Sequence, residues 1–318
     1  MQTVLSPSVI EEIRDLKTRK NAIILAHNYE LPEIQDIADV VGDSLGLSQK
    51  AAATDADIII FCGVHFMAET ASILAPDKKV LIPDLNAGCS LAATITADQL
   101  RKWKADNPGA VVVSYVNTTA DVKAETDYCC TSSNAVKVVQ AIPEDQPILF
   151  LPDMFLGAYV KNQTGRTNMK IWSGECHVHA GIRPEAMAEK RAQFPNAEFL
   201  IHPECGCASA AMLSMAENPG CFPDTHVCST EGMIRRVDQS PKNEFLIATE
   251  TGIMHRMRRF HPDKKFIAVN DHAVCRFMKM ITLDKLLRSL REDVFEVKVP
   301  KETADKARLA IQRMIEIC

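Results

Sequence analysis

Long apolar runs are missing from this sequence. No stretch of its 318 residues approaches the roughly 20 apolar residues that span a bilayer, so we expect no transmembrane helix. The first 20 residues lack an apolar core and place acidic residues ahead of basic ones, which does not fit a signal peptide. We therefore expect a cytoplasmic protein.

A surplus of positive charge is also lacking. The net charge is −5, the isoelectric point is about 6.0, and no Lys/Arg cluster is interleaved with aromatic residues. Nucleic acids and anionic membranes attract basic surfaces, so neither is an expected partner. Small molecules are the expected ligands.

Local metal-binding motifs are absent too, although the chain has 11 cysteines. It contains neither a C-x2-C pair of the zinc-ribbon kind nor a ferredoxin run C-x2-C-x2-C, the usual local ligand sets. An odd number of widely spaced cysteines in a reducing compartment does not indicate a disulfide framework. The thiols must therefore serve dispersed metal binding, catalysis or simple burial.

What the sequence does contain is a recurring rhythm of strands and helices. Apolar runs such as AIILA (22–26), DIIIF (57–61) and PILFL (147–151) end at polar residues, which is typical of parallel strands buried on both faces. The residues between the runs predict helices, including one at 32–41. The polar residues 129–134 predict a turn that caps a helix at 135–140.

This rhythm occurs three times, with a period too long for a solenoid repeat. We therefore predict an α/β fold of three similar three-layer αβα domains, with small parallel sheets around a pseudo-threefold axis and the active site at the centre. The expected domains are 1–89, completed by C-terminal helices at 276–318, then 90–176 and 177–275.

Each third ends in a cysteine that follows its last strand, namely Cys89, Cys176 and Cys275. Three thiolates from dispersed positions can hold a zinc ion or three corners of a cubane iron–sulfur cluster. In such a cluster one iron would have no protein ligand. That iron could act as a Lewis acid toward a hydroxyl or a carboxylate.

The other polar residues at the strand ends form the wider candidate site. Ligands of open parallel sheets bind outside the carboxyl ends of the strands, close to helix N-termini. If the three sheets face one another, these ends meet in one central cavity. The candidates are His27, Tyr29, Ser44, Cys89, Tyr115, Asn117, Ser132, Cys176, His202, Glu204, Ser229, Thr230 and Cys275.

Ordinary structural roles can explain the same residues one at a time. A cysteine at a strand end is more often a small buried hydrophobe than a metal ligand, and Cys62 is expected in the core. His177 and His179 can cap a helix, residues 132–133 can form an N-cap, and Glu204 can be a solvated loop acid. Their joint occurrence at corresponding places in all three thirds favours the shared site.

Several blocks of the sequence resemble the quinolinate synthase family of bacterial NAD biosynthesis, over residues 21–287. They are ILAHNYELPEIQDIADVVGDSL, GVHFMAETASIL, PDLNAGCSLA, SYVNTTADVKAETD, CTSSNAV, LPDMFLG, WSGECHVH, HPEC, STEGM, ATETGI and the cysteine followed by MKMITL. The resemblance implies a transferase that condenses iminoaspartate with dihydroxyacetone phosphate to quinolinate, with loss of phosphate and two waters. It also implies functional coupling to an L-aspartate-oxidising enzyme.

The resemblance further implies a 4Fe-4S cluster with three ligands, Cys89, Cys176 and Cys275, and one open iron. The remaining strand-end candidates would then line the substrate site. We expect Glu204 and Tyr29 to transfer protons and His27 to polarise a triose oxygen. Ser44 and Ser132, each expected at a helix start, suit a phosphate. The dicarboxylate end of the substrate would be held by Tyr115, Asn117, His202, Ser229 and Thr230.

The sequence departs from this family in two respects, at the third ligand and in the cysteine-bearing loop from Cys205 to Cys228. Some members carry a CxxCxxC run at the third ligand, whereas residues 269–275 read VNDHAVC here, so we expect no regulatory disulfide from that run. Cys205, Cys207 and Cys221 are expected to be spare core or surface thiols. Three other classes stay open: a hydro-lyase of another hydroxy acid, a cluster-based redox sensor without turnover, and a zinc-bound structural protein.

Overall fold

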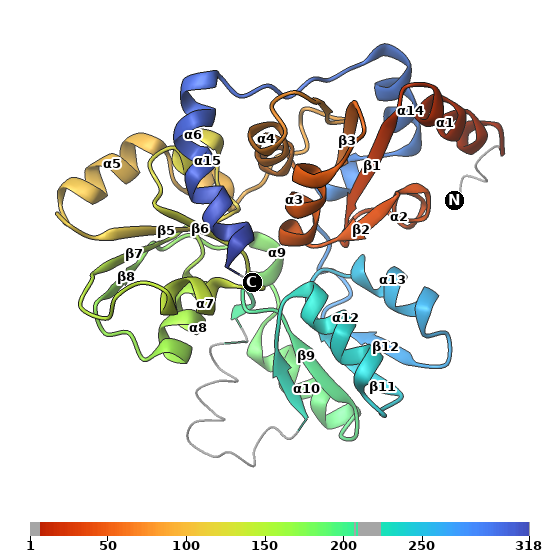
Figure 1. Ribbon diagram of the computed structural model, residues 1–318. Helices are drawn as coiled ribbons and strands as arrows, with labels where there is room; N and C mark the ends of the chain where they lie inside the picture. Colours follow the sequence, from red (N-terminus) through yellow and green to blue (C-terminus); the bar gives the residue numbers. More distant parts are fainter. Residues whose placement is uncertain (1–6, 207, 209–223, 318) are drawn as a thin grey trace.

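Three small parallel sheets form the framework of the protein (Figure 1). The computed structural model describes residues 7–206, 208 and 224–317. The first sheet contains β1 (Ala22–His27), β2 (Val40–Gly42), β3 (Ile58–Cys62) and β4 (Lys79–Leu81); the second contains β5 (Val111–Tyr115), β6 (Tyr128–Cys130), β7 (Ile148–Leu151) and β8 (Met169–Ile171); the third contains β9 (Glu198–Ile201), β10 (Thr225–Val227), β11 (Glu244–Ala248) and β12 (Lys265–Ala268).

All three sheets have the same strand order. The orders are β2-β1-β3-β4, β6-β5-β7-β8 and β10-β9-β11-β12, and every pair of neighbours is parallel. Their carboxyl ends turn toward the middle of the molecule (Figure 1). The predicted fold class of three similar αβα units is thereby confirmed, whereas the domain boundaries at residues 89, 176 and 275 stay a prediction.

Helices cover both faces of the sheets (Figure 1). In chain order they are α1 (Pro7–Arg19), α2 (Pro32–Ile37), α3 (Ser44–Ala53), α4 (His65–Leu74), α5 (Ala97–Ala105), α6 (Ala120–Lys123), α7 (Ala135–Gln140), α8 (Met154–Thr164), α9 (His177–Ala180), α10 (Pro184–Gln193), α12 (Thr230–Gln239), α13 (Ile253–Phe260), α14 (Leu283–Glu292) and α15 (Lys301–Glu316). The part of the chain that the structure describes also contains two 3-10 turns, η1 (Ala92–Thr94) and η2 (Met278–Met280). As expected for sheets covered on both sides, β3, β7 and β9 are buried along their whole length, and Cys62 lies in the core.

Two short edge strands differ from the prediction. The helix expected at 32–41 ends at Ile37, and Val40–Gly42 pairs with β1 as β2. The turn expected at 129–134 begins as a strand, because Tyr128–Cys130 pairs with β5. Three residues are too few to show a strand period in sequence, so pairing with the neighbouring strand decides their conformation.

The C-terminal helices pack on two different thirds. Helix α14 lies against α1 and β3 of the first third, whereas α15 lies against α3, α4, α6 and β6 and so bridges the first and second thirds (Figure 1). The Arg313 guanidinium stacks 4.6 Å above the Tyr128 ring. Among the described residues, none of the helices has the length and apolar character needed to cross a membrane.

Candidate active site

A central cavity lies where the carboxyl ends of the three sheets meet. Its empty space is about 700 Å³, including the part open to solvent, which suits a small-molecule site. The predicted residues that line it are His27, Tyr29, Ser44, Cys89, Tyr115, Asn117, Ser132, Cys176, His202, Glu204, Thr230 and Cys275. Ser229 is the exception, because its hydroxyl caps α12 by accepting the Gly232 N–H at 3.2 Å.

The three cysteines of this cavity occupy matching positions. Each follows the fourth strand of its third and begins a helical turn, since the carbonyls of Cys89, Cys176 and Cys275 accept the N–H groups of residues 93, 180 and 279 at 3.2, 2.8 and 3.1 Å. All three thiols are free. The Cys89 and Cys275 sulfurs also face backbone N–H groups of their own turns, which favours a thiolate.

The donor set of this trio fits a metal group. Burial raises the pKa of Cys275 to about 11, and burial together with the neighbouring Cys176 raises the pKa of Cys89 further. Half-buried thiols that share one cavity gain from a cation between them, because metal coordination deprotonates a thiol. Zinc and iron–sulfur clusters are the groups that thiolates prefer.

The remaining described cysteines lie elsewhere. Cys129 and Cys130 are buried in β6, and Cys228 is free and half-buried. Cys205 is buried as expected, but it is disulfide-bonded, which corrects the expectation that it is a spare thiol. Cys207 and Cys221 lie outside the described residues.

Two histidines occupy equivalent strand ends, His27 after β1 and His202 after β9. His27 Nδ1 accepts the backbone N–H of Tyr29 at 3.2 Å, and His202 Nδ1 accepts the backbone N–H of Glu204 at 3.4 Å. Burial lowers the pKa of both rings to about 3. Both imidazoles are therefore neutral at physiological pH, with the ring proton on Nε2, which is an electrophilic donor rather than a base.

Glu204 is a buried carboxylate held by two partners. Tyr115 Oη donates to its Oε1, and His179 Nδ1 lies 3.0 Å from its Oε2. Burial alone would raise the pKa of this carboxyl, but His179, His202 and the Tyr115 hydrogen bond together lower it to about 2. The expectation of a solvated loop acid is wrong, since Glu204 is only 3% exposed.

A hydrogen-bonded chain continues from Glu204 to Tyr29. His179 Nε2 lies 2.8 Å from Thr249 Oγ1, which lies 2.5 Å from Tyr29 Oη. Although burial opposes it, the negative charges of Cys176 and Glu204 raise the pKa of His179 well above its usual value. Burial and the charge of Glu204 raise the pKa of Tyr29. The chain thus links residues from all three thirds through a charged imidazole.

Thr249 is a site residue that the sequence did not single out, whereas His179 was expected to cap a helix or to support the ligand Cys176. The two histidines beside Cys176 suggested helix capping, yet His179 lies within α9 and stacks on His202 with ring centroids 4.8 Å apart. His177 is exposed, and its Nδ1 lies 2.6 Å from Ser90 Oγ. The position of Thr249 directly after β11 was the available signal, because most of the candidate residues lie at the end of a strand or soon after it.

Residues that follow the edge strands β2, β6 and β10 contact one another. Ser133 Oγ donates to Asp43 and lies 2.9 Å from Ser229 Oγ, so one residue of each third joins this contact. Ser44 and Thr230 are the first residues of α3 and α12. Ser132 is not at a helix start, because Asn134 is the N-cap of α7. Its hydroxyl lies 3.2 Å from His202 Nε2.

A buried ion pair ties the Cys275 turn to the Tyr29 loop. Glu250 Oε1 accepts the Cys275 N–H at 3.0 Å and lies 3.0 Å from Lys279 Nζ. Lys279 Nζ also donates to the Tyr29 carbonyl. A Cβ on Gly252 would lie 2.7 Å from Lys279 Nζ, so this close approach requires a glycine.

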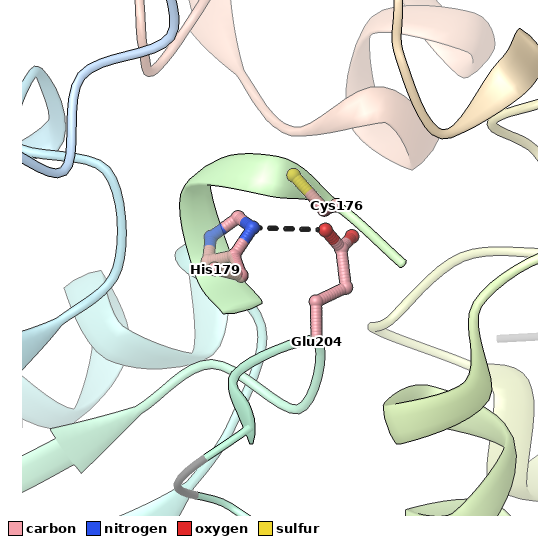
Figure 2. Close-up of side chains that lie close together, drawn as sticks. All are labelled: Cys176, His179 and Glu204. Carbon is pink, nitrogen blue, oxygen red and sulfur yellow. Dashed lines mark ion pairs between the residues drawn. The ribbon is translucent and has the colours of Figure 1, made fainter. Parts of the chain in front are cut away.

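Cys176, His179 and Glu204 form a further group with metal-ligand character (Figure 2). One donor atom from each lies within 4.8 Å of the other two. Cys176 and His179 come from one short segment, and Glu204 approaches from the loop after β9 (Figure 2). The described residues therefore include a Cys/His/Glu group that could hold a metal ion.

Comparison with known proteins matches nearly the whole chain to one family. The family described as "Quinolinate synthetase A protein" matches residues 11–316. A quinolinate synthase of Mycobacterium sp. (strain KMS) is 60% identical over 308 residues, 96% of this chain and 91% of that protein. That of Pyrobaculum aerophilum is 55% identical over 306 residues, 96% of this chain and 98% of that protein. That of Mycobacterium tuberculosis (strain ATCC 25618 / H37Rv) is 56% identical over 96% of this chain and 88% of that protein.

Proposed function

This chain belongs to the quinolinate synthase family of enzymes, and on that premise we propose that it condenses iminoaspartate with dihydroxyacetone phosphate to quinolinate, releasing phosphate and two waters. Both substrates are small and anionic. They suit a central cavity that is walled by neutral histidines and hydroxyl groups. Iminoaspartate would come from an enzyme that oxidises L-aspartate.

We propose that Cys89, Cys176 and Cys275 hold a 4Fe-4S cluster at one end of the cavity. Three free thiols that line one cavity support this assignment. When bound, the cluster would supply an iron without a protein ligand, which is a Lewis acid for a substrate oxygen.

Other residues of the cavity would bind the substrate and transfer protons. Glu204, a carboxylate with a pKa of about 2, is ionised and suited to accept a proton. Tyr29 and His179 are protonated and suited to donate one, and the Thr249 hydroxyl joins them. This chain would let a proton taken up at Glu204 be returned at Tyr29, as successive dehydrations require.

Substrate binding divides between the two ends of the cavity. Ser44 and Thr230 begin helices whose first N–H groups favour anions. Ser44 and Ser132 are the proposed phosphate contacts. His27 would donate its Nε2 proton to a triose oxygen. The dicarboxylate is assigned to Tyr115, Asn117, His202, Ser229 and Thr230, although Ser229 would act there only as the cap of α12.

The observation that carries this proposal is the meeting of the three cysteines with Glu204, His179 and Tyr29 in one cavity. Purification without oxygen tests it. We expect a brown protein with the absorbance of a 4Fe-4S cluster that forms quinolinate from iminoaspartate and dihydroxyacetone phosphate. A colourless protein would favour a zinc-bound structural role, and a brown protein without turnover would favour a redox sensor.

Two variants separate the cluster from the proton chemistry. We expect Cys176→Ala to lose both the cluster and activity. Glu204→Gln should keep the cluster and lose activity by about 10²-fold or more, the usual contribution of acid–base catalysis. A Cys176→Ala variant with a full cluster and full activity would contradict the ligand assignment, and a fully active Glu204→Gln variant would contradict the role of Glu204.

A further inference from the structure

One nitrogen of the site, His179 Nδ1, faces the Glu204 carboxylate in the proton chain but makes no hydrogen bond within the described part of the chain. His179 is 2% exposed, and its Nδ1 has no hydrogen-bond partner among the described residues. It lies 3.0 Å from Glu204 Oε2 without the alignment of a hydrogen bond. A buried ring nitrogen without a hydrogen bond is rare because its desolvation is costly. This nitrogen is therefore a candidate ligand atom.

The surroundings of this nitrogen are those of a single metal ion. Glu204 Oε1 accepts from Tyr115, which leaves Oε2 to face His179. The Cys176 sulfur is the third donor, and all three atoms lie within 4.8 Å of one another (Figure 2). The donors of a tetrahedral zinc ion lie about 3.2–3.6 Å apart, as follows from bond lengths of about 2.0–2.3 Å. Small side-chain rotations would close the remaining gap.

The orientation of the histidine is also that of a metal ligand. A ligating imidazole is normally held through its second nitrogen by a hydrogen-bond partner. Here His179 Nε2 is held by Thr249 Oγ1 at 2.8 Å. The spacing Cys176-x2-His179 on α9 presents the sulfur and the nitrogen from one short helix.

We propose that the cluster-free protein binds one Zn²⁺ ion through Cys176, His179 and Glu204, and that binding releases one proton each from Cys176 and His179 to solvent. One thiolate, one imidazole and one carboxylate make a set of three protein ligands with an open fourth position, the pattern of catalytic zinc sites. Zn²⁺ binds such a set more tightly than Fe²⁺ does. The fourth position faces the cavity, where water can occupy it.

This zinc site excludes the proposed cluster because both use the Cys176 sulfur. That exclusion rests on the proposed function, whereas zinc binding itself does not. A zinc ion bound before the cluster forms would leave the protein colourless and inactive. The cavity therefore contains two alternative metal sites that share one thiolate and differ in every other ligand.

Zinc binding to the full-length, cluster-free protein tests the proposal. With Zn²⁺ as the probe and a chromogenic chelator as the competitor, we expect one ion per chain at this site. We expect His179→Gln to weaken binding at least tenfold, and Thr249→Val to weaken it about tenfold to a hundredfold, as for other partners of a ligating histidine. The Co²⁺ derivative should show charge transfer from a single thiolate.

Two variants with opposite expected effects distinguish the zinc site from the cluster site. The variant Cys89→Ala/Cys275→Ala should keep the zinc affinity of the native chain and fail to hold a cluster. His179→Gln should assemble a cluster with full iron and sulfide content when reconstituted without oxygen. Loading the native chain with Zn²⁺ first should prevent cluster assembly in proportion to the zinc bound.

Three outcomes would overturn the proposal. Zinc affinity could be lost in Cys89→Ala/Cys275→Ala, which would indicate a site of three thiolates. It could be unchanged in His179→Gln, which would place the ion on other groups of the chain. The cluster could assemble on protein already saturated with zinc. If zinc binds as proposed but the zinc-free protein with its cluster assembled forms no quinolinate, only the proposed function is contradicted.

Discussion

At the scale of single residues, burial assigns opposite roles to chemically similar groups. His27 and His202 are neutral because burial lowers their pKa to about 3, whereas His179 is charged because Cys176 and Glu204 raise its pKa. One cavity thus contains both neutral and charged imidazoles. Their sequence neighbours alone could not have distinguished them.

The two neutral histidines predict a loss of stability in acid. An unfolded histidine binds a proton below a pH of about 6.5, while the folded rings bind one only near pH 3. Unfolding therefore takes up protons between these values, and the free energy of unfolding falls by about 1.4 kcal/mol per pH unit for each ring as the pH is lowered. His179 acts in the opposite direction above about pH 6.5, where its raised pKa adds stability that is lost as pH rises.

Denaturant unfolding of cluster-free protein across pH 3.5–6.5 measures this effect. We expect His202→Asn to flatten the pH dependence by about 1.4 kcal/mol per pH unit, and the exposed His272→Asn to leave it unchanged. Parallel curves for the native chain and His202→Asn would show that His202 is not a buried neutral group.

Much of the site could be predicted from the sequence, because most of its residues lie at the ends of strands. Twelve of the candidates line the cavity, since a strand end is visible in sequence as a polar residue after an apolar run. The roles of Thr249 and His179 could not be identified, because they depend on contacts across 70 residues of chain. Such contacts form only when the third sheet packs against α9.

At the scale of elements, sequence was reliable for the buried strands and for the edge strands β4, β8, β10 and β12, but it missed the edge strands β2 and β6. The runs at β3 and β7 are recognisable because both faces of these strands are buried. The edge strands β2 and β6 have three residues each and were assigned to a helix and a turn. Their conformation comes from pairing with β1 and β5, which local sequence does not encode.

The turn after β12 illustrates how one element positions another. Glu250 accepts the Cys275 N–H and pairs with Lys279, which donates to the Tyr29 carbonyl. Lys279 therefore holds the Tyr29 loop against the Cys275 turn. It is a positioning residue, because its contacts are with the protein rather than with a reacting group.

Replacing Lys279 should lower turnover without loss of the cluster. We expect Lys279→Met to reduce kcat about tenfold to a hundredfold, because displacement of Tyr29 by about 1 Å is enough. KM should change little and iron content should stay full. Lys279→Arg should recover part of kcat. The control is Lys285→Met, which removes a half-exposed pair with Asp84; equal losses in both variants would contradict the positioning role.

At the scale of the whole molecule, the C-terminal helix completes the site by joining two thirds. Asn134 Nδ2 donates to the carbonyls of Met314 and Ile317 at 2.7 and 2.8 Å, and its Oδ1 accepts the Thr131 N–H at 2.8 Å. The loop that carries Ser132 is thereby fixed to α15. The C-terminal end of α15 therefore supports the wall of the cavity.

Removal of this tie should affect both stability and substrate binding. We expect Asn134→Ala to lower the free energy of unfolding by about 2–3 kcal/mol, because it breaks buried hydrogen bonds, and to raise KM for dihydroxyacetone phosphate. Asn168→Ala is a matched control, because Asn168 also donates to two carbonyls but lies far from the cavity. An unchanged KM in Asn134→Ala would contradict the link between α15 and the phosphate contact.

We propose that the three similar parts of the chain together hold one iron–sulfur cluster, bound by Cys89, Cys176 and Cys275. Anomalous X-ray diffraction at the iron absorption edge, on crystals of protein kept free of oxygen, tests it most directly. We expect one peak of four iron atoms in the central cavity, bonded to these three sulfurs, with one iron facing Glu204 and Tyr29. Iron bound by other cysteines, or a cavity without iron in active protein, would contradict it.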